Sequence, residues 1–452
     1  MIPVLMSLSP LVGSLLSLFL GRRQREICCI LSSLISLILA ATAFISVKAE
    51  PELFLSGEII LDGLGALTAF LISLIVLLAS VYSPRYMNLE EGKHRTYYFL
   101  LQLFNFTMLS VCISNNIFLI WVFVEATTLS SVFLVTIRGD PTSLEAGWKY
   151  VLLCTVGLSI ALFGTVMLYV EALERVGESG ILWTELIKNK NILNVKAMET
   201  AVIFIIAGYG VKAGLFPFHW WLPDTYSEAP TPVSSVLSGV LINCSFLAIA
   251  RFYLLSPSGV ASSLLLLLGI ISALFGSIAM IGQANMKRLL AYSSVENMGI
   301  ACIGLGAGGV GIMFSIFHVF NHGLLKSAAF LSWGGVEKSN KAEVPPSVAF
   351  SLILSFILLG GCPPSGIFLS ELGVLTSVVR NALLAVAYLI SVFTSFSVLS
   401  YNAMERGLGR PTGGNSSPIW IVPLISSAIS IAIGLYPSPL LQVIEEFLGG
   451  VS

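Results

Sequence analysis

The sequence places a charged side chain inside an apolar stretch, where it is costly. Lys212 lies in the apolar run 201–218, and glycines and Pro217 flank it. An ammonium at membrane depth costs roughly 2.5–3.5 kcal/mol on insertion scales, so such a lysine needs a partner or a task. Helix-breaking residues beside a buried charge indicate an interrupted helix that lines a hydrated path. Lys212 is therefore a candidate ion-relay residue.

A carboxylate occupies the middle of another apolar run. Glu125 lies in the run 116–137, where burial favours the neutral carboxyl and a nearby ammonium favours the charged one. Lys212 is one candidate partner, and Lys149, near the start of the run 146–170, is the other. Two alternatives stay open: Glu125 as a neutral packing residue, and Lys149 as a lysine that extends to the membrane surface.

Three further polar residues share one helix face. His318, His322 and Lys326 are spaced i, i+4 and i+8 in the apolar run 308–332, so a helix would align them. Imidazole titrates near neutrality and both donates and accepts a proton. The stripe therefore predicts a proton relay through intervening waters. A metal site lacks an evident third ligand, and a purely structural role in joining helices is the other alternative.

Two more acids complete the set. Glu371 follows a Gly/Pro-rich stretch, 360–364, which repeats the pattern around Lys212. Glu296 lies early in the run 290–306 and is either a relay acid or an interfacial acid beside the basic pair that precedes it.

Apolar helices would be needed to position these residues in a membrane, and the composition of the chain predicts such helices. The chain has 452 residues, 56% hydrophobic and 10% charged, whereas soluble domains have about 25% charged residues. We therefore predict an all-α polytopic membrane protein with about 14 transmembrane helices, at ~17–25 residues each. The predicted runs are 2–20, 27–47, 63–83, 97–113, 116–137, 146–170, 199–218, 228–251, 260–282, 290–306, 308–332, 347–379, 381–403 and 418–436. The run 347–379 is too long for one span and predicts two half-helices around a break.

Composition and motifs exclude several function classes. The net charge is −1 and no basic stripe is present, which argues against nucleic-acid binding. The seven cysteines form no CxxC pair or Cys/His cluster, so iron–sulfur and zinc ligation are not expected. The run 2–20 is followed, not preceded, by arginines and is expected to be a retained span. We expect a small extracellular hairpin at 51–62 and short structure in the loop 171–198.

Basic residues predict the orientation. One set of alternate loops, taken as cytoplasmic, holds Arg22, Arg23, Arg25, Arg85, Lys93, Arg95, Arg138, Lys287, Arg288, Lys338, Lys341, Arg406 and Arg410. The opposite loops hold fewer: Lys48, Arg175, Lys188, Lys190, Lys196, Arg251 and Arg380. Both termini are therefore expected on the extracytoplasmic side of the cell membrane.

The intramembrane charges recur with an offset of five spans. The pairs are Glu125 with Glu296, Lys149 with Lys326, and Lys212 with Glu371. An odd offset reverses membrane orientation, as in inverted-topology repeats. The expected division is 1–96 for spans one to three, 97–252 for the first repeat, 253–403 for the second, and 404–452 for span fourteen.

Four segments carry a close resemblance to a known family. They are GYGVKAGLFPFHWWLPDTYSEAPTP (208–232), QANMKRLLAYSSVENMG (283–299), FHVFNHGLLKS (317–327) and PPSGIFLSE (363–371). The chain resembles the antiporter-like proton-pumping subunits shared by respiratory complex I, Mrp-type Na⁺/H⁺ antiporters and energy-converting membrane hydrogenases. The similarity extends over roughly spans three to thirteen, and the lysine-centred motif is highly specific.

The resemblance implies 14 helices, two inverted five-helix repeats and broken helices seven and twelve. It also implies two half-channels joined by a mid-membrane row. By motif, Glu125 and Lys212 take the places of the family's Glu–Lys pair. His318, His322 and Lys326 fall in the connecting stretch, and Glu371 takes the terminal site.

Two departures from the family pattern matter. Asn243 stands where several members have a bridging lysine, so water or His318 would have to span that gap. Glu371 stands where many members have lysine. Together with the sequences SSVENMG and NHGLLKS, these two residues favour the hydrogenase-type branch of the family.

We therefore expect a non-redox, ion-translocating subunit of a redox-driven oxidoreductase or translocase complex. Its expected partners are other membrane subunits, including small antiporter-like ones, and a peripheral redox arm. Iron–sulfur or nickel–iron centres are expected in those partners, and no cofactor in this chain. The alternatives are an Mrp-type Na⁺/H⁺ antiporter subunit driven by ion gradients and a structural scaffold whose charges only join helices.

Overall fold

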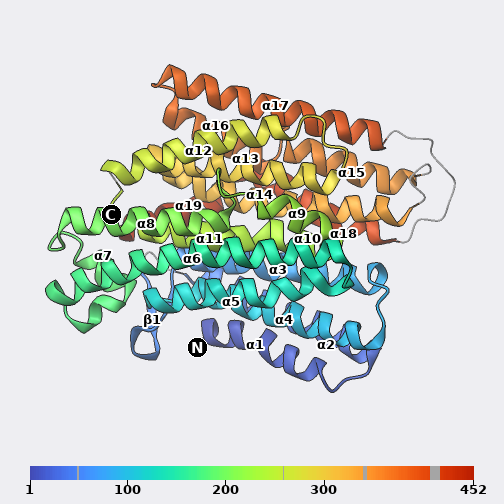
Figure 1. Cartoon of the computed structure of the whole chain (residues 1–452), viewed down its shortest axis with the longest axis horizontal. Helices are drawn as coiled ribbons and strands as arrows, with labels where there is room; N and C mark the ends of the chain where they lie inside the picture. Colours follow the sequence, from blue (N-terminus) through green and yellow to red (C-terminus); the bar gives the residue numbers. More distant parts are fainter. Residues whose placement is uncertain (48–49, 258, 340–343, 408–417, 452) are drawn as a thin grey trace.

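The computed structural model describes the chain except residues 48–49, 258, 340–343, 408–417 and 452. The described part is nearly all helical, and most of its helices run side by side along the long axis of the molecule (Figure 1). Lys48, Lys341 and Arg410, which entered the orientation argument, lie outside the described residues.

The N-terminal part consists of three long helices and one small hairpin. The helices are α1 (Ile2–Ser17), α2 (Arg22–Ser46) and α3 (Gly63–Tyr86). Strands β1 (Glu52–Phe54) and β2 (Ile59–Leu61) pair antiparallel between α2 and α3. They form the hairpin that the sequence predicted there.

The next part contains α4 (Glu91–Ile113), α5 (Ile117–Val135), α6 (Pro141–Arg175), α7 (Trp183–Lys188), α8 (Val195–Ala213), α9 (Trp221–Glu228), α10 (Thr231–Val236) and α11 (Ile242–Tyr253). A π-helical turn, Leu237–Leu241, joins α10 to α11 into one continuous helical rod. α7 is the short structure expected in the loop 171–198.

The last part contains α12 (Gly259–Ala279), α13 (Met286–Ala307), α14 (Val310–Lys338), α15 (Pro346–Leu359), α16 (Gly366–Val378), α17 (Ala382–Gly407), α18 (Ile421–Leu435) and α19 (Ser438–Val451). Every predicted run therefore contains helix. α7, α19 and all but the last residue of α9 lie outside those runs. α19 bends by 73° from α18.

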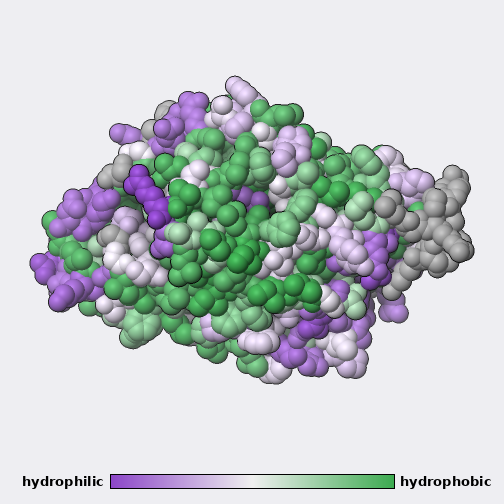
Figure 2. Space-filling model, turned by 90° about the horizontal axis from the view of Figure 1, so that it is seen from above, coloured by the Kyte–Doolittle hydropathy of each residue, from purple (hydrophilic) through white to green (hydrophobic). Residues whose placement is uncertain are grey.

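Within the described residues, eight helices are long and apolar enough to cross a membrane, or nine if the bent pair α18–α19 is one span. The face that carries α17 shows a broad hydrophobic middle with hydrophilic residues toward its two ends (Figure 2). This distribution is typical of a protein embedded in a bilayer.

Side-chain caps begin several of these helices. Asn116 accepts hydrogen bonds from the backbone of Phe118 and Leu119 at the start of α5, and Asn285 does the same at the start of α13. Asparagine is favoured there because its side chain satisfies amide groups that have no partner within the helix.

Two helical rods are interrupted by similar devices. Between α8 and α9, Gly214 has φ 77° and the Phe216–Pro217 bond is cis. Between α15 and α16, Gly361 has φ 87° and the Pro363–Pro364 bond is cis. Only glycine adopts such a left-handed conformation without strain, so these residues end each first half-helix.

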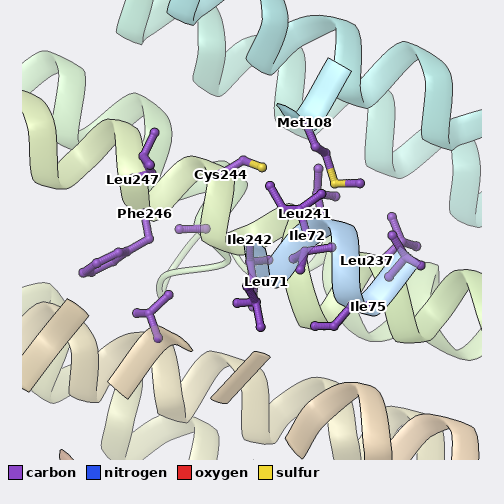
Figure 3. Close-up of a cluster of buried hydrophobic side chains, with 14 of the residues drawn as sticks. Leu71, Ile72, Ile75, Met108, Leu237, Leu241, Ile242, Cys244, Phe246 and Leu247 are labelled. Atoms are coloured by element: carbon purple, nitrogen blue, oxygen red, sulfur yellow. The ribbon is translucent and has the colours of Figure 1, made fainter. Parts of the chain in front are cut away.

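α14 forms the centre of the molecule. It packs against α3, α13, α15, α16 and α18, and most of its side chains are buried. The π-helical turn and the start of α11 lie next to it, and their apolar side chains pack on Leu71, Ile72 and Ile75 of α3 and Met108 of α4 (Figure 3). The segment that carries Asn243 is thus held in the core.

Candidate ion-relay site

Lys212 lies in the last turn of α8 and is fully buried. Its ammonium donates hydrogen bonds to the carbonyl of Val124, to Thr127 Oγ1 at 2.7 Å and to Thr128 Oγ1 at 2.5 Å. A cation at a helix C-terminus is favoured by the helix dipole. The buried lysine is therefore held by three oxygens of α5 at the point where its own helix is interrupted.

Glu125 lies on the same stretch of α5 but faces α6. Its Oε1 accepts a hydrogen bond of 2.9 Å from Thr155. In the described part of the chain, no ion pair within 4.0 Å joins it to Lys212, although the two charges are close enough to interact. Val124, Thr127 and Thr128 are spaced i, i+3 and i+4 and share one helix face, whereas Glu125 is rotated about 100° from Val124. Glu125 and the oxygens that hold Lys212 therefore lie on different faces of α5, and the two charges act on each other without a direct ion pair.

Lys149 lies at the surface, which is one of the two positions that the sequence left open for it. Its side chain is 46% exposed and pairs with Glu145 at 2.8 Å and Asp224 at 3.0 Å. Asp224, on α9, also pairs with Arg288 of α13 at 3.1 Å. Lys149 thus belongs to a surface network of charges that joins α6, α9 and α13.

A second buried lysine resembles the first. Lys326, on α14, donates to the carbonyl of Leu290 at 2.6 Å and to the hydroxyl of Ser293, both on α13. Glu296 lies one turn farther along α13, is buried, and interacts with the Lys326 charge. Its Oε2 accepts from Ser395 of α17 at 3.4 Å.

Glu371 lies on α16, just after the second helix interruption. It is 8% exposed, and its carboxyl group lies against Gly361. Glu296 is close enough to interact with it electrostatically. The second half of the molecule therefore gathers one lysine and two carboxyl groups.

The two histidines lie along α14 between these groups. Their rings are stacked, with centroids 6.4 Å apart and an interplanar angle of 18°. His318 Nδ1 lies 2.9 Å from Ser370 Oγ of α16. Neither ring nitrogen of His322 has a hydrogen-bond partner among the described residues. Buried nitrogens of this kind are costly unless another donor or acceptor reaches them.

Asn243 lies between the two halves, immediately after the π-helical turn. Its amide nitrogen donates to the carbonyls of Gly239 at 3.0 Å and Val319 at 3.1 Å, so it joins α11 to α14. Gly323 lies opposite, where an added Cβ would come within 2.9 Å of the Asn243 amide nitrogen. π-Helical turns of this kind often accompany functional sites.

Two buried groups were not predicted as site residues. Arg251 was assigned to a loop, but the structure buries it in the last turn of α11, paired with Asp62 at 3.0 Å. His219 is buried in the first helix interruption, where its ring contacts Phe216 and Trp220. The position of His219 beside Pro217 was the available sequence signal. Arg251 gave no signal, because its partner is 189 residues away.

The described residues hold no group of three or more His, Cys, Asp or Glu side chains that could bind a metal. All seven cysteines are free thiols. The buried lysines, carboxyl groups and imidazoles that lie close together are groups that can exchange protons or hold a cation.

Comparisons with known proteins agree with this chemistry. Residues 114–397 match the family described as "NADH:quinone oxidoreductase/Mrp antiporter, TM". The chain is 35% identical over 432 residues to the "Hydrogenase-4 component F homolog" of Methylacidiphilum infernorum, covering 89% of this chain and 90% of that protein.

Solved structures share the fold. A chain of the membrane-bound sulfane sulfur reductase, an archaeal respiratory membrane complex, matches with a TM-score of 0.89 at 23% identity over 99% of this chain and 97% of that one. A chain of the Mrp complex from Dietzia sp. matches with a TM-score of 0.88 at 17% identity, over 100% and 97% of the two chains.

Proposed function

The chain belongs to the NADH:quinone oxidoreductase/Mrp antiporter family, and we propose that it is the antiporter-like membrane subunit of a redox-driven respiratory complex. It translocates protons and carries no redox centre itself. The hydrogenase-4 relative favours a complex of the membrane-bound hydrogenase or complex I type. One observation carries the proposal: two buried lysines, Lys212 and Lys326, each rest on a neighbouring helix that bears a carboxyl group within electrostatic reach.

We assign the relay to a row that begins at Glu125 and Lys212 and ends at Glu371. His322 and His318 carry the middle of the row, and Lys326 with Glu296 forms its second charged site. The unpaired nitrogens of His322 support this assignment, because a relay needs donors and acceptors that can change partners. Lys149 lies outside this row, and we assign it the role of holding α9 in place at the surface through its ion pair with Asp224.

Asn243 interrupts the row with a group that cannot carry a proton charge. A cavity of about 20 Å³ borders Asn243 and Thr68. One water molecule needs at least ~10–15 Å³, so the cavity has room for one. A water there would have the free amide oxygen of Asn243 and the hydroxyl of Thr68 as polar partners, and we assign the step past Asn243 to it.

We propose that the helices make 14 membrane crossings and that residues 97–252 and 253–403 form two inverted repeats. The similar interruptions at Gly214 and Gly361 support the repeats. Residues 1–96 precede them and 404–452 follow. Both chain ends lie in the half of the molecule that carries β1 and α7 (Figure 1), which supports placing both termini on one side of the membrane. The excess of basic residues in the opposite loops assigns that side as extracytoplasmic.

The partners that we propose are other membrane subunits, small antiporter-like ones included, and a peripheral redox arm. The arm would hold the iron–sulfur or nickel–iron centres. The matches to a respiratory membrane complex and to an Mrp complex support membership of a multi-subunit assembly.

The test is Lys212→Ala in the assembled complex, reconstituted in proteoliposomes with electron donor and acceptor. We expect proton transfer to be lost while electron transfer persists and the subunits still co-purify. Lys188→Ala, at an exposed lysine of α7, is the matched control and should transfer protons normally. Wild-type proton transfer in Lys212→Ala would contradict the proposal. Transport driven by a sodium gradient without electron donor would instead assign the chain to an Mrp-type antiporter.

A further inference from the structure

A pocket opens on the outer surface of the molecule beside Glu371. It lies between the second helix interruption, α16 and α17, and has a volume of about 350 Å³. Small-molecule sites typically measure roughly 300–1,000 Å³, so the pocket has room for a small ligand but not for a helix about 10 Å wide.

The floor of this pocket carries a carboxyl group that needs a partner. Glu371 is 92% buried, and its carboxyl oxygens receive no hydrogen bond and no ion pair within the described ranges of the chain. Glu296, on α13, is close enough to interact with it electrostatically and is another carboxyl group. A cationic ligand would supply the partner that Glu371 lacks and would favour the ionised form of its carboxyl group.

The walls are apolar and aromatic. Phe368 comes from α16, and Tyr388, Phe393 and Phe396 come from α17. The Tyr388 hydroxyl already donates to the carbonyl of Glu371 at 2.9 Å, so its ring is what it offers to the pocket. Aromatic rings around a carboxyl group are an arrangement that recognises alkylated ammonium groups, through cation–π attraction to the rings and ionisation of the carboxyl beside the cation.

The rim faces the apolar surface of the protein. Phe393 is 72% exposed and Leu389 is 49% exposed, and both belong to α17. α17 lies at the upper edge of the molecule in Figure 1, so it belongs to the face that Figure 2 shows from above. A ligand would therefore enter from the hydrocarbon of the bilayer and must itself have an apolar body.

We infer that the pocket binds an amphiphilic amine, with its ammonium group on Glu371 and its apolar body among the aromatic rings. Such a ligand occupies the carboxyl group at the end of the relay and blocks ion transfer there. The blocking effect rests on the proposed function, whereas the binding does not.

The binding test uses decyltrimethylammonium and its uncharged analogue, in which carbon replaces the nitrogen. Binding is measured by equilibrium dialysis with the full chain in maltoside micelles, after subtraction of empty micelles. We expect saturable binding of the cation and at least about tenfold weaker binding of the analogue. Equal affinity for both compounds would mean partition into apolar surface and would overturn the inference.

Three variants locate the site. Glu371→Gln keeps the shape of the side chain and should weaken binding about tenfold or more. Phe393→Leu removes one exposed ring and should weaken it about three- to tenfold. Phe133→Leu, an equally apolar change at an exposed position of α5, should leave it unchanged. Unchanged affinity in both pocket variants would overturn the inference, even if one of them folds poorly.

The last experiment measures binding and proton transfer in the assembled complex. Binding to the complex, with inhibition of proton transfer that Phe393→Leu relieves, supports the whole inference. Binding without inhibition keeps the site but contradicts the role of Glu371 in the relay. Binding to the isolated chain but not to the complex would assign the pocket to a partner subunit and overturn the inference of a free amine.

Discussion

Replacing Arg251 tests how a charge pair is held in the interior of this protein. The side chains of Arg251 and Asp62 are 0% and 3% exposed and lie 3.0 Å apart. The guanidinium also donates to the carbonyls of Ser114 at 2.6 Å and Cys112 at 3.1 Å. In Arg251→Met, Asp62 keeps only its 2.6 Å bond from the backbone of Gly65. Removing one partner of a buried pair costs about 3–5 kcal/mol, and we expect that loss of stability.

The matched variant is Asp62→Asn, which removes the opposite charge and keeps the side-chain shape. The double variant should lose less stability than the two single losses combined, with a coupling of about 2–3 kcal/mol. Unfolding by SDS in mixed micelles, followed by tryptophan fluorescence, measures all four proteins. Trp183 is a local reporter because its ring centroid lies 5.4 Å from the guanidinium. Additive losses, or a loss below about 1 kcal/mol for Arg251→Met, would refute the reasoning.

Three further predictions address the relay and its support. Asn243→Leu removes one of the two polar side chains that line the cavity beside α11 and should lower proton transfer at least about tenfold in proteoliposomes; an unchanged rate would exclude a path past Asn243. Asp224→Asn breaks the link to Lys149 and should slow transfer, and the charge exchange Asp224→Lys with Lys149→Asp should restore part of the rate; no restoration would contradict a positioning role. Gly323→Val should lower the midpoint of thermal unfolding, measured in detergent, because its side chain meets Asn243 and the facing helix; a wild-type midpoint would mean that the helices separate freely.

The sequence predicted the helices well because their apolar runs are long and its helix breakers are clear. The sequence also identified Lys212, because a charged residue within an apolar run is easily recognised. The sequence could not predict which residues of α5 contact Lys212. Whether Glu125 or the neighbouring Thr128 faces α8 depends on a rotation of α5, which packing against other helices sets.

Residues with a weak local signal, or with none, were missed or left open. The sequence left open whether Lys149 lies at the surface, and its ion pairs with Glu145 and Asp224 place it there. Arg251 was assigned to a loop because its partner, Asp62, is distant in sequence and contacts it only in the folded chain. His219 carries no obligatory charge, so its burial costs less than that of a lysine, and only the neighbouring Pro217 marked its position in the sequence.

The surface network around Asp224 gives ionic strength a selective effect on this protein. Charges in water are screened beyond a Debye length of about 8 Å at 0.15 M salt and about 3 Å at 1 M, whereas buried charges are screened much less. Asp224 links Lys149 and Arg288 at the surface, while Lys212 and Lys326 are fully buried. A salt titration of the unaltered protein would therefore weaken the attachment of α9 and leave the buried lysines as they are. A salt titration can thus separate the contribution of the surface ion pairs of α9 to transport from that of the buried lysines, without a mutation.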